Sequence, residues 1–115
     1  MSSMRNRLTL IGHLGADPEL KSFDGGKKMT RVSIATTEWH KNAAGDWTSE
    51  TTWHQVTAWG QLAERICEKL RKGSETALEC QVLNNNYTDK DGVKKYNTEL
   101  RLSNVLFLGK QGERE

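Results

Sequence analysis

Proline, cysteine and long apolar runs are scarce in this sequence of 115 residues. It has one proline, Pro18, beside ten glycines, which excludes a proline-rich chain and favours an ordered domain with tight turns. No apolar segment approaches the roughly 18 residues that cross a bilayer. Polar residues interrupt the N-terminal apolar segment, so we do not expect a secretory signal. We expect a cytoplasmic protein without membrane contact.

The two cysteines, Cys67 and Cys80, stand far apart, with no Cys-x-x-Cys pair and no histidine at metal-ligand spacing. This arrangement predicts free thiols in a reducing compartment and argues against a zinc site. Residues 89–92 resemble the middle of a calcium loop, but that register puts tyrosine and threonine where carboxylates are required. We therefore interpret this segment as a turn and expect neither a metal nor another cofactor.

An excess of charge of one sign is lacking as well. Lys and Arg number 17 against 15 Asp and Glu, and the net charge of +2 does not by itself indicate nucleic-acid binding. Nucleophile-elbow, zinc-protease and phosphate-loop motifs are absent, and His13, His40 and His54 fall in separate predicted elements. In a chain long enough for one domain, these absences predict a binding protein and not an enzyme.

Alternating apolar and polar residues predict five strands, and one segment has the period of a helix. The strands are expected over 6–14, 29–37, 51–59, 76–86 and within 93–108, and the helix over 61–72. Residues 39–47 lose the period and are expected to form a loop bounded by two tryptophans. One helix between the third and fourth of five strands is the order of a mainly β, five-stranded OB-fold barrel. We assign this domain to residues 1–109 and a short polar tail to 110–115.

Tryptophan is unusually frequent among the aromatic residues, with 4 Trp beside 2 Tyr and 2 Phe. Trp53 and Trp59 share one face of the third predicted strand with Gln55 and Thr57, a mixture that a dry core disfavours. Exposed rings suit base stacking, because every base has a π-face. An equally open interpretation is that these rings fill the core or a subunit contact.

Basic residues are interleaved with these rings along the sequence. Singly, each is an ordinary solvated surface charge, but collected along a groove they would follow a phosphate backbone. The basic set comprises Arg5, Arg7, Lys27, Lys28, Arg31, Lys41, Arg71, Lys72, Lys90, Lys94 and Lys95. The candidate phosphate contacts chosen from it are Arg7, Lys41, Arg71, Lys72 and Lys94.

Several short segments, spaced over residues 6–108, carry a family pattern. They are GHLGADPEL (12–20), IAT (34–36), TWHQV (52–56), WGQLAE (59–64), LRKGS (70–74), YTD (87–89) and YNTE (96–99). In this order they resemble the bacterial-type single-stranded DNA-binding proteins of replication and repair. The resemblance implies an OB-fold homotetramer that wraps single-stranded DNA at the nucleoid, without sequence preference, in replication, recombination and repair.

The resemblance also assigns roles to individual residues. The family's stacking aromatics fall on Trp39, Trp53, Trp59 and Tyr87. His54 matches a histidine of the family's subunit interface, although a hydrogen-bonded sheet histidine is the other interpretation. The first predicted strand has the length and alternation to pair with its copy across a two-fold axis. The candidate interface residues are Arg7, Leu8, Leu10 and His54.

Three departures from the family pattern stand out. Gln55 and Gln61 replace residues that are often basic, which predicts weaker phosphate contact. Cys80 occupies a position that is usually Gly, so its side chain needs space in the strand. The sequence has no long linker with an acidic tip, so recruitment of enzymes through such a tail is not expected from this chain.

Two other function classes compete with this interpretation. One is a primosome-type OB-fold adaptor, which would not need rings spread over three elements. The other is an OB-fold RNA-binding module, for which we identify neither the short aromatic-rich motif nor a reader of the 2′-hydroxyl.

Overall fold

The computed structural model describes residues 5–108, which form strands, a short 3-10 turn and a single α-helix. The elements in chain order are β1 (Leu8–Leu14), β2 (Lys21–Ser22), η1 (Asp24–Gly26), β3 (Lys28–Lys41), β4 (Trp47–Trp59), α1 (Gln61–Lys69), β5 (Glu75–Asn84), β6 (Tyr87–Thr88), β7 (Lys94–Lys95) and β8 (Thr98–Phe107). The predicted domain boundary at 109 and the tail at 110–115 lie outside the described residues.

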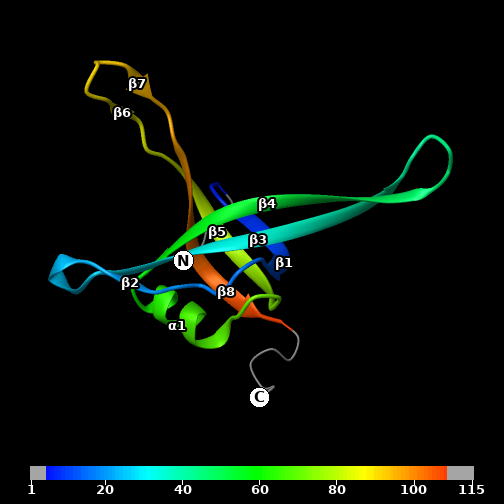
Figure 1. The fold of residues 1–115 in the computed structure, drawn as a ribbon, viewed down its shortest axis with the longest axis horizontal. Helices are drawn as coiled ribbons and strands as arrows, with labels where there is room; N and C mark the ends of the chain where they lie inside the picture. Colours follow the sequence, from blue (N-terminus) through cyan, green and yellow to red (C-terminus); the bar gives the residue numbers. More distant parts are fainter. Residues whose placement is uncertain (1–4, 109–115) are drawn as a thin grey trace.

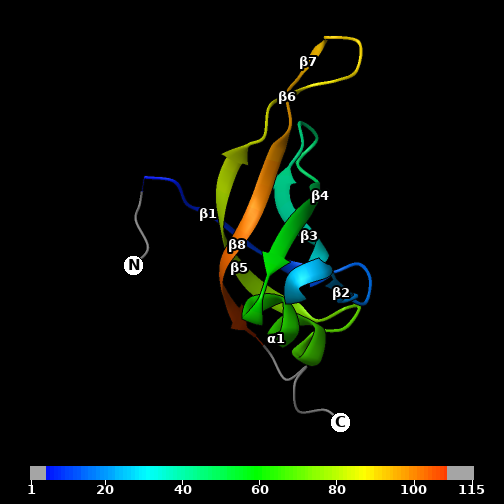
Figure 2. The same cartoon turned by 90° about the vertical axis from the view of Figure 1, so that its left-hand side faces the viewer.

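Five of the strands form a closed barrel (Figures 1 and 2). The order around it is β1-β5-β8-β4-β3, and β1 closes it by pairing with β3. Neighbours are antiparallel except β4 and β8, which run parallel at Val56–Leu100 and Thr57–Arg101. The helix α1 connects β4 to β5 and lies at one end of the barrel (Figure 2). The predicted OB-fold with one helix between its third and fourth strands is confirmed.

The core consists of apolar residues that alternate along the strands, together with the inner face of α1. Its buried members are Leu10, Leu14, Val32, Ile34, Val56, Ala58, Ala63, Ile66, Leu70, Leu78, Cys80, Leu102 and Val105. Fully burying an aliphatic side chain of this size contributes about 1.5–3 kcal/mol, so this cluster carries the stability of the domain. Val82 continues the same parity in β5 but is exposed, and it lies beyond Cys80, the last residue of β5 that pairs with β1.

Gly12 allows β1 and β3 to approach each other where the barrel closes. The closing pairs are His13 with Ala35 and Leu14 with Ile34. A Cβ atom at Gly12 would collide with the carbonyl oxygen of Ala35. Only glycine fits this contact, which gives Gly12 a packing role in addition to its place near the strand end.

The helix is one turn shorter than the 61–72 predicted from its period. It ends at Lys69, and Leu70 is already extended, with φ −109° and ψ 146°. The Arg71 guanidinium donates hydrogen bonds of 2.9 Å to the carbonyl oxygens of Cys67 and Leu70, which satisfies carbonyls at the helix end. Leu70 keeps the apolar spacing and is buried, so periodicity alone placed the end too late.

The predicted loop at 39–47 is wrong in its extent, because residues 39–41 and Trp47 belong to strands. β3 and β4 stay paired out to Lys41–Trp47, and only residues 42–46 form the turn. Asn42 Oδ1 accepts hydrogen bonds from the backbone N–H groups of Ala44 (2.9 Å) and Asp46 (3.0 Å). The alternation fades because this part of the hairpin extends past the core and is exposed on both faces. We call the segment 38–50 the β3–β4 arm.

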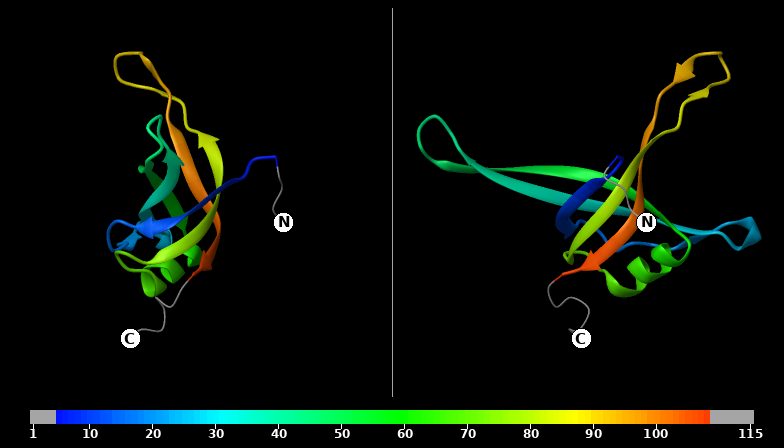
Figure 3. Two further views of the ribbon diagram at one scale, coloured as in Figure 1. Left: turned by 90° about the vertical axis from the view of Figure 1, so that its right-hand side faces the viewer. Right: turned by 180° about the vertical axis from the view of Figure 1, so that it is seen from behind.

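A second hairpin, the β6–β7 arm, projects from the barrel between β5 and β8 (Figure 3). At its tip, Asp89 Oδ1 accepts hydrogen bonds from the N–H groups of Asp91 (3.0 Å) and Val93 (2.9 Å), as expected of a turn. The two arms give a radius of gyration of 16.7 Å. A compact chain of this length has a value of about 13 Å, so much of the surface lies on projecting hairpins.

Candidate nucleic-acid interface

The four tryptophans lie on one face of the β3–β4 hairpin. Residues directly opposite each other in an antiparallel pair point to the same side of the sheet. The register places Trp59 opposite Met29, Trp53 opposite Ala35, Trp39 opposite Ser49 and Trp47 opposite Lys41. We call this side of β3 and β4 the tryptophan face. Its rings are 65% (Trp39), 63% (Trp47), 59% (Trp53) and 38% (Trp59) exposed, which excludes the core interpretation for them.

Gly15 supports the ring of Trp53. A Cβ atom at Gly15 would enter the six-membered part of the Trp53 indole, so the ring rests directly on backbone. The Gly15 N–H donates a 2.9 Å hydrogen bond to the carbonyl oxygen of Ser33, which ties this segment to β3. Trp53 is therefore positioned by a backbone contact while more than half of its surface stays open to solvent.

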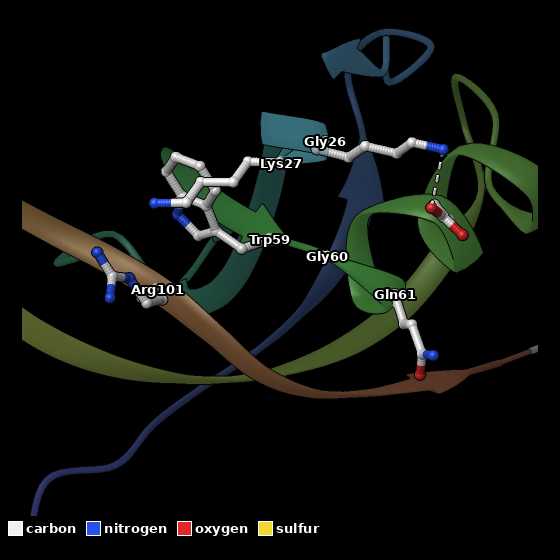
Figure 4. Close-up of a pocket in the computed structure, with 8 residues that line it drawn as sticks. Gly26, Lys27, Trp59, Gly60, Gln61 and Arg101 are labelled. Atoms are coloured by element: carbon white, nitrogen blue, oxygen red, sulfur yellow. Dashed lines mark ion pairs between the residues drawn. The ribbon is translucent and has the colours of Figure 1, made fainter. Parts of the chain in front are cut away.

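Trp59 forms one wall of an open pocket of about 580 Å³ (Figure 4). Lys27 and Arg101 line the same pocket and bring two cationic side chains to the ring. The Phe23 ring packs against Trp59 with a centroid distance of 6.1 Å and an interplanar angle of 34°. The remaining lining residues are Gly26, Lys28, Gly60, Gln61 and Glu64, of which Lys28 and Glu64 form a 3.1 Å ion pair.

An anionic residue, Glu99, lines the neighbouring groove of about 340 Å³ beside Trp59 and Gln55. Its carboxylate accepts hydrogen bonds from Asn85 (2.8 Å) and from two nitrogens of Arg101 (both 3.2 Å). The pKa of Glu99 is lowered first by the hydrogen bonds from Arg101, against the opposing effect of burial, and further by Asn85 and the Trp59 side chain. Glu99 is thus ionised at neutral pH and holds Arg101 near Trp59.

One of the predicted phosphate contacts, Lys41, lies on the tryptophan face. Lys41 stands at the tip of the face, with its Nζ 5.5 Å from the centre of the Trp47 ring. Lys72 follows the helix, and its backbone N–H donates a 2.7 Å hydrogen bond to Asp17, two residues beyond the glycine that supports Trp53.

The other three predicted phosphate contacts either bind neighbouring groups of the protein or lie away from the tryptophan face. Arg7 lies on the β1–β5 side of the barrel and forms a 2.7 Å ion pair with Glu79. Arg71 directs its guanidinium to the helix end, as described above. Lys94 pairs with Thr88 on the β6–β7 arm, whereas Tyr87 lies opposite Lys95. Tyr87 itself is 57% exposed and stands apart from the tryptophan face on its own arm.

The candidate interface residues have different surroundings. Leu10 is buried in the core and Leu8 packs against it, so any contact with a second copy would use their backbone. His54 Nε2 lies 3.0 Å from Thr36 Oγ1, the hydrogen-bonded sheet histidine of the second interpretation. β1 pairs with β5 along residues 8–13 but with β3 only at His13 and Leu14. Among the described residues its other edge from 8 to 12 therefore has no strand partner.

Sequence reasoning missed Trp47, Gly15, Phe23 and Glu99 as members of this surface. Trp47 lies at the end of the segment predicted as a loop, but it stands six residues before Trp53 with the same parity, and this spacing is the available signal. The roles of Gly15, Phe23 and Glu99 depend on contacts between distant segments and have no local signal. In the described part of the chain, no three His, Cys, Asp or Glu side chains gather as a metal site, and no helix is long and apolar enough to cross a membrane.

Several proteins of known sequence are similar to this chain. A single-stranded DNA-binding protein of Xanthomonas campestris pv. campestris is 41% identical over 108 residues, which cover 94% of this chain and 63% of that protein. Single-stranded DNA-binding protein 1 of Xylella fastidiosa (strain 9a5c) is 40% identical over 107 residues, covering 92% of this chain and 79% of that protein. The chain spans 60–63% of the length of the two Xanthomonas relatives that it matches.

A solved structure and a family model extend the similarity to the fold. A Plasmodium falciparum SSB complex with ssDNA is similar with a TM-score of 0.76 and 27% identity, over 95% of this chain and 99% of that chain. The model of the single-strand binding protein family matches residues 5–108, the same residues that form the barrel and its two arms. This chain belongs to the single-strand binding protein family.

Proposed function

We propose that this protein binds single-stranded DNA without sequence preference, by stacking bases on Trp39, Trp53 and Trp59 and on Tyr87 of the β6–β7 arm. The observation that carries the proposal is the alignment of exposed indoles on one sheet face. Each base stacked on an aromatic ring contributes about 1–3 kcal/mol and does so for any base. The relatives that are named single-stranded DNA-binding proteins and the neighbour in complex with ssDNA support the same ligand.

In this proposal, contacts to the phosphates contribute less to the affinity than base stacking does. Lys41 lies on the tryptophan face, and Lys27 and Arg101 line the Trp59 pocket. We include Lys72, after the helix, as a further phosphate contact. Arg7, Arg71 and Lys94 lie away from the tryptophan face, so they would contact the backbone only outside the row of rings. Cations of this kind hold the backbone of a strand whose bases stack on the rings.

The assembly that we propose is a homotetramer built on the free edge of β1. Unpaired strand edges favour pairing with another chain, and an antiparallel β1–β1 pair is compatible with a two-fold axis. Leu8 and Leu10 lie in this strand, Arg7 directly precedes it, and His54 belongs to the proposed interface as well. Light scattering at micromolar concentration should give four times the chain mass of 13.0 kDa, and a monomer would refute the assembly.

In the cell, we place this binding activity in the cytoplasm at the nucleoid, where it protects single strands during replication, recombination and repair. The proposed activity is binding without catalysis, and it requires neither metal nor cofactor. Single-stranded DNA and further copies of the chain are the partners.

Fluorescence titration with equal lengths of single-stranded DNA, duplex DNA and RNA tests the function. Single-stranded DNA should quench tryptophan emission strongly, whereas duplex should bind weakly because paired bases hide the faces that stack. Trp53→Ala should weaken binding about fivefold to 150-fold, and Leu106→Ala, an exposed apolar position off the tryptophan face, serves as the control. Equal affinity for duplex would overturn the proposal, preference for RNA would favour the RNA-binding alternative, and absence of quenching would favour an adaptor.

A further inference from the structure

The tip of the β3–β4 arm carries an aromatic ring that the proposed set of stacking residues does not include. Trp47 is the first residue of β4 and lies opposite Lys41, the last residue of β3. Lys41 Nζ stands over one side of the indole at 5.5 Å from its centre, and Trp47 is 63% exposed. A cation over one side of an indole stabilises its orientation and leaves the opposite side available to a ligand.

Packing does not explain a tryptophan at this place. The arm has passed beyond the barrel, and at its outer end both strands are exposed on both faces. The turn at 42–46 is held by the side chain and backbone of Asn42, so the indole is not required for the hairpin to close. A large exposed indole on a well-formed arm is typical of a binding position.

The spacing of the rings makes Trp47 the end of a row. Trp47, Trp53 and Trp59 follow each other at intervals of six residues in one strand. At about 3.4 Å per residue, successive rings are about 20 Å apart and the row is about 40 Å long. Trp39, opposite Ser49, lies between Trp47 and Trp53 on the neighbouring strand. A strand that follows the row outward from the Trp59 pocket reaches Trp47 last.

We infer that Trp47 and Lys41 form a further nucleotide-binding position at the outer end of the tryptophan face, where the indole stacks one base and the ammonium group contacts the adjacent phosphate. The inference rests on the proposed function and deepens it. It has a specific consequence, because only strands long enough to run from the barrel to the arm tip can occupy this position.

A length series of oligodeoxythymidines tests the inference. OB-folds contact about 4–16 nucleotides, so the series should span this range. Trp47→Ala and unmodified protein should bind the shortest strands alike and then diverge, with Trp47→Ala about fivefold to 150-fold weaker on the longest. Trp47→Phe, which keeps an aromatic ring, should retain most of the affinity for long strands.

A direct optical test uses a variant in which Trp47 is the single tryptophan, made by Trp39→Phe, Trp53→Phe and Trp59→Phe. Long strands should quench its emission and short strands should not. Lys41→Gln in the same background should reduce the salt dependence of binding to long strands by about one phosphate contact.

The outcomes separate this inference from the proposed function. If Trp53→Ala weakens binding while Trp47→Ala has no effect at any length, the arm-tip position is refuted and the proposed function stands. If neither substitution has an effect, the proposed function fails as well. If Trp47→Ala changes the mass in light scattering but not the DNA affinity, the arm tip contacts a second copy of the chain and the inference is overturned.

Discussion

At the scale of single residues, Gly15 determines where the Trp53 ring can lie. Because a Cβ atom at this position would enter the indole, Gly15→Ala must displace the ring. We expect the substitution to weaken single-stranded DNA binding by up to one base stack, about 1–3 kcal/mol. A double-mutant cycle measured by fluorescence titration checks this mechanism: in a Trp53→Ala background, Gly15→Ala should cost less than about 0.5 kcal/mol of binding. Equal effects in both backgrounds would mean that Gly15 acts elsewhere.

Glu99 gives a prediction about pH. Its pKa is lowered in the folded protein, so its charged form stabilises the fold above the unfolded pKa of about 4.3, and this contribution is lost as the pH falls through the lower folded value. Glu99→Gln should therefore reduce the unfolding free energy at pH 7, and by less at an acidic pH below the unfolded pKa. Urea unfolding at the two pH values measures it. A difference that is constant with pH would contradict the role of the charge.

The same substitution affects the proposed DNA contact. Without the carboxylate, Arg101 loses its partner beside Trp59 and is free to contact phosphate. Glu99→Gln should therefore bind single-stranded DNA more tightly at low salt than unmodified protein.

Cys80 is the third residue with a testable environment. Burial, with a contribution from the Glu79 charge, raises the pKa of its thiol to about 11. The unfolded thiol ionises at about 8.5, so its contribution to stability is present below that pH and is lost as the pH rises toward the folded value. A thiol reagent at neutral pH should modify partly exposed Cys67 quickly and buried Cys80 only after unfolding.

At the scale of elements, Cys80 lies beside the irregularity of the β5–β8 pair. The register shifts between Glu79 and Cys80, and Ser103 Oγ donates a 3.0 Å hydrogen bond to the Glu79 carbonyl oxygen. The extra residue of this irregularity is Ser103 in β8, and it lies next to the pair formed by buried Cys80 and Leu102.

The two arms offer a matched pair of predictions. Asn42 and Asp89 each accept two backbone hydrogen bonds inside a turn beyond the core. Asn42→Ala and Asp89→Ala should leave the melting temperature of the barrel within a few degrees, since no core contact is lost. Hydrogen exchange should show faster opening of the β3–β4 arm in the first variant and of the β6–β7 arm in the second. Opening of the wrong arm, or of both, would contradict this local role.

Alternation predicted the barrel strands because it follows burial. Leu10 and Leu14 in β1 and Val56 and Ala58 in β4 all lie inward as their parity indicates. Alternation does not predict strands where no residue is buried. The outer half of the β3–β4 hairpin has no buried face, so its sequence is typical of a loop. For the same reason Trp47 is not identified as a member of the tryptophan face. The helix ends where the Leu70 backbone becomes extended and the Arg71 side chain donates a hydrogen bond to the last turn. The hydrophobic period of the sequence contains neither of these features.

At the scale of the whole molecule, positive and negative charges nearly balance, and part of the positive charge is paired. Within residues 5–108, the basic residues in ion pairs with acidic neighbours include Arg7, Lys28, Lys95 and Arg101. With a net charge of +2, the molecule has a weak long-range attraction for phosphate. Stacking therefore supplies most of the proposed affinity.

The small electrostatic share of the proposed affinity predicts how DNA binding responds to salt. Log affinity for single-stranded DNA should fall linearly with log salt, by about 0.7 per neutralised phosphate, and substantial binding should persist at about 1 M salt, where exposed charges are screened within about 3 Å. Titrations from low to high salt measure the slope. Trp53→Ala should lower the affinity at every salt concentration without changing the slope, and a changed slope would assign Trp53 an electrostatic role.

The shared register of the tryptophan face also restricts how the hairpin can change in length. Because side chains alternate between the two faces of a strand, inserting one residue between Trp47 and Trp53 would turn Trp47 to the opposite side of the sheet. Inserting two residues would keep it on the same side and move it about 7 Å outward. Variants of this hairpin that preserve the row of rings should thus differ by even numbers of residues in this segment, whereas the turn at 42–46 is free to vary by any number.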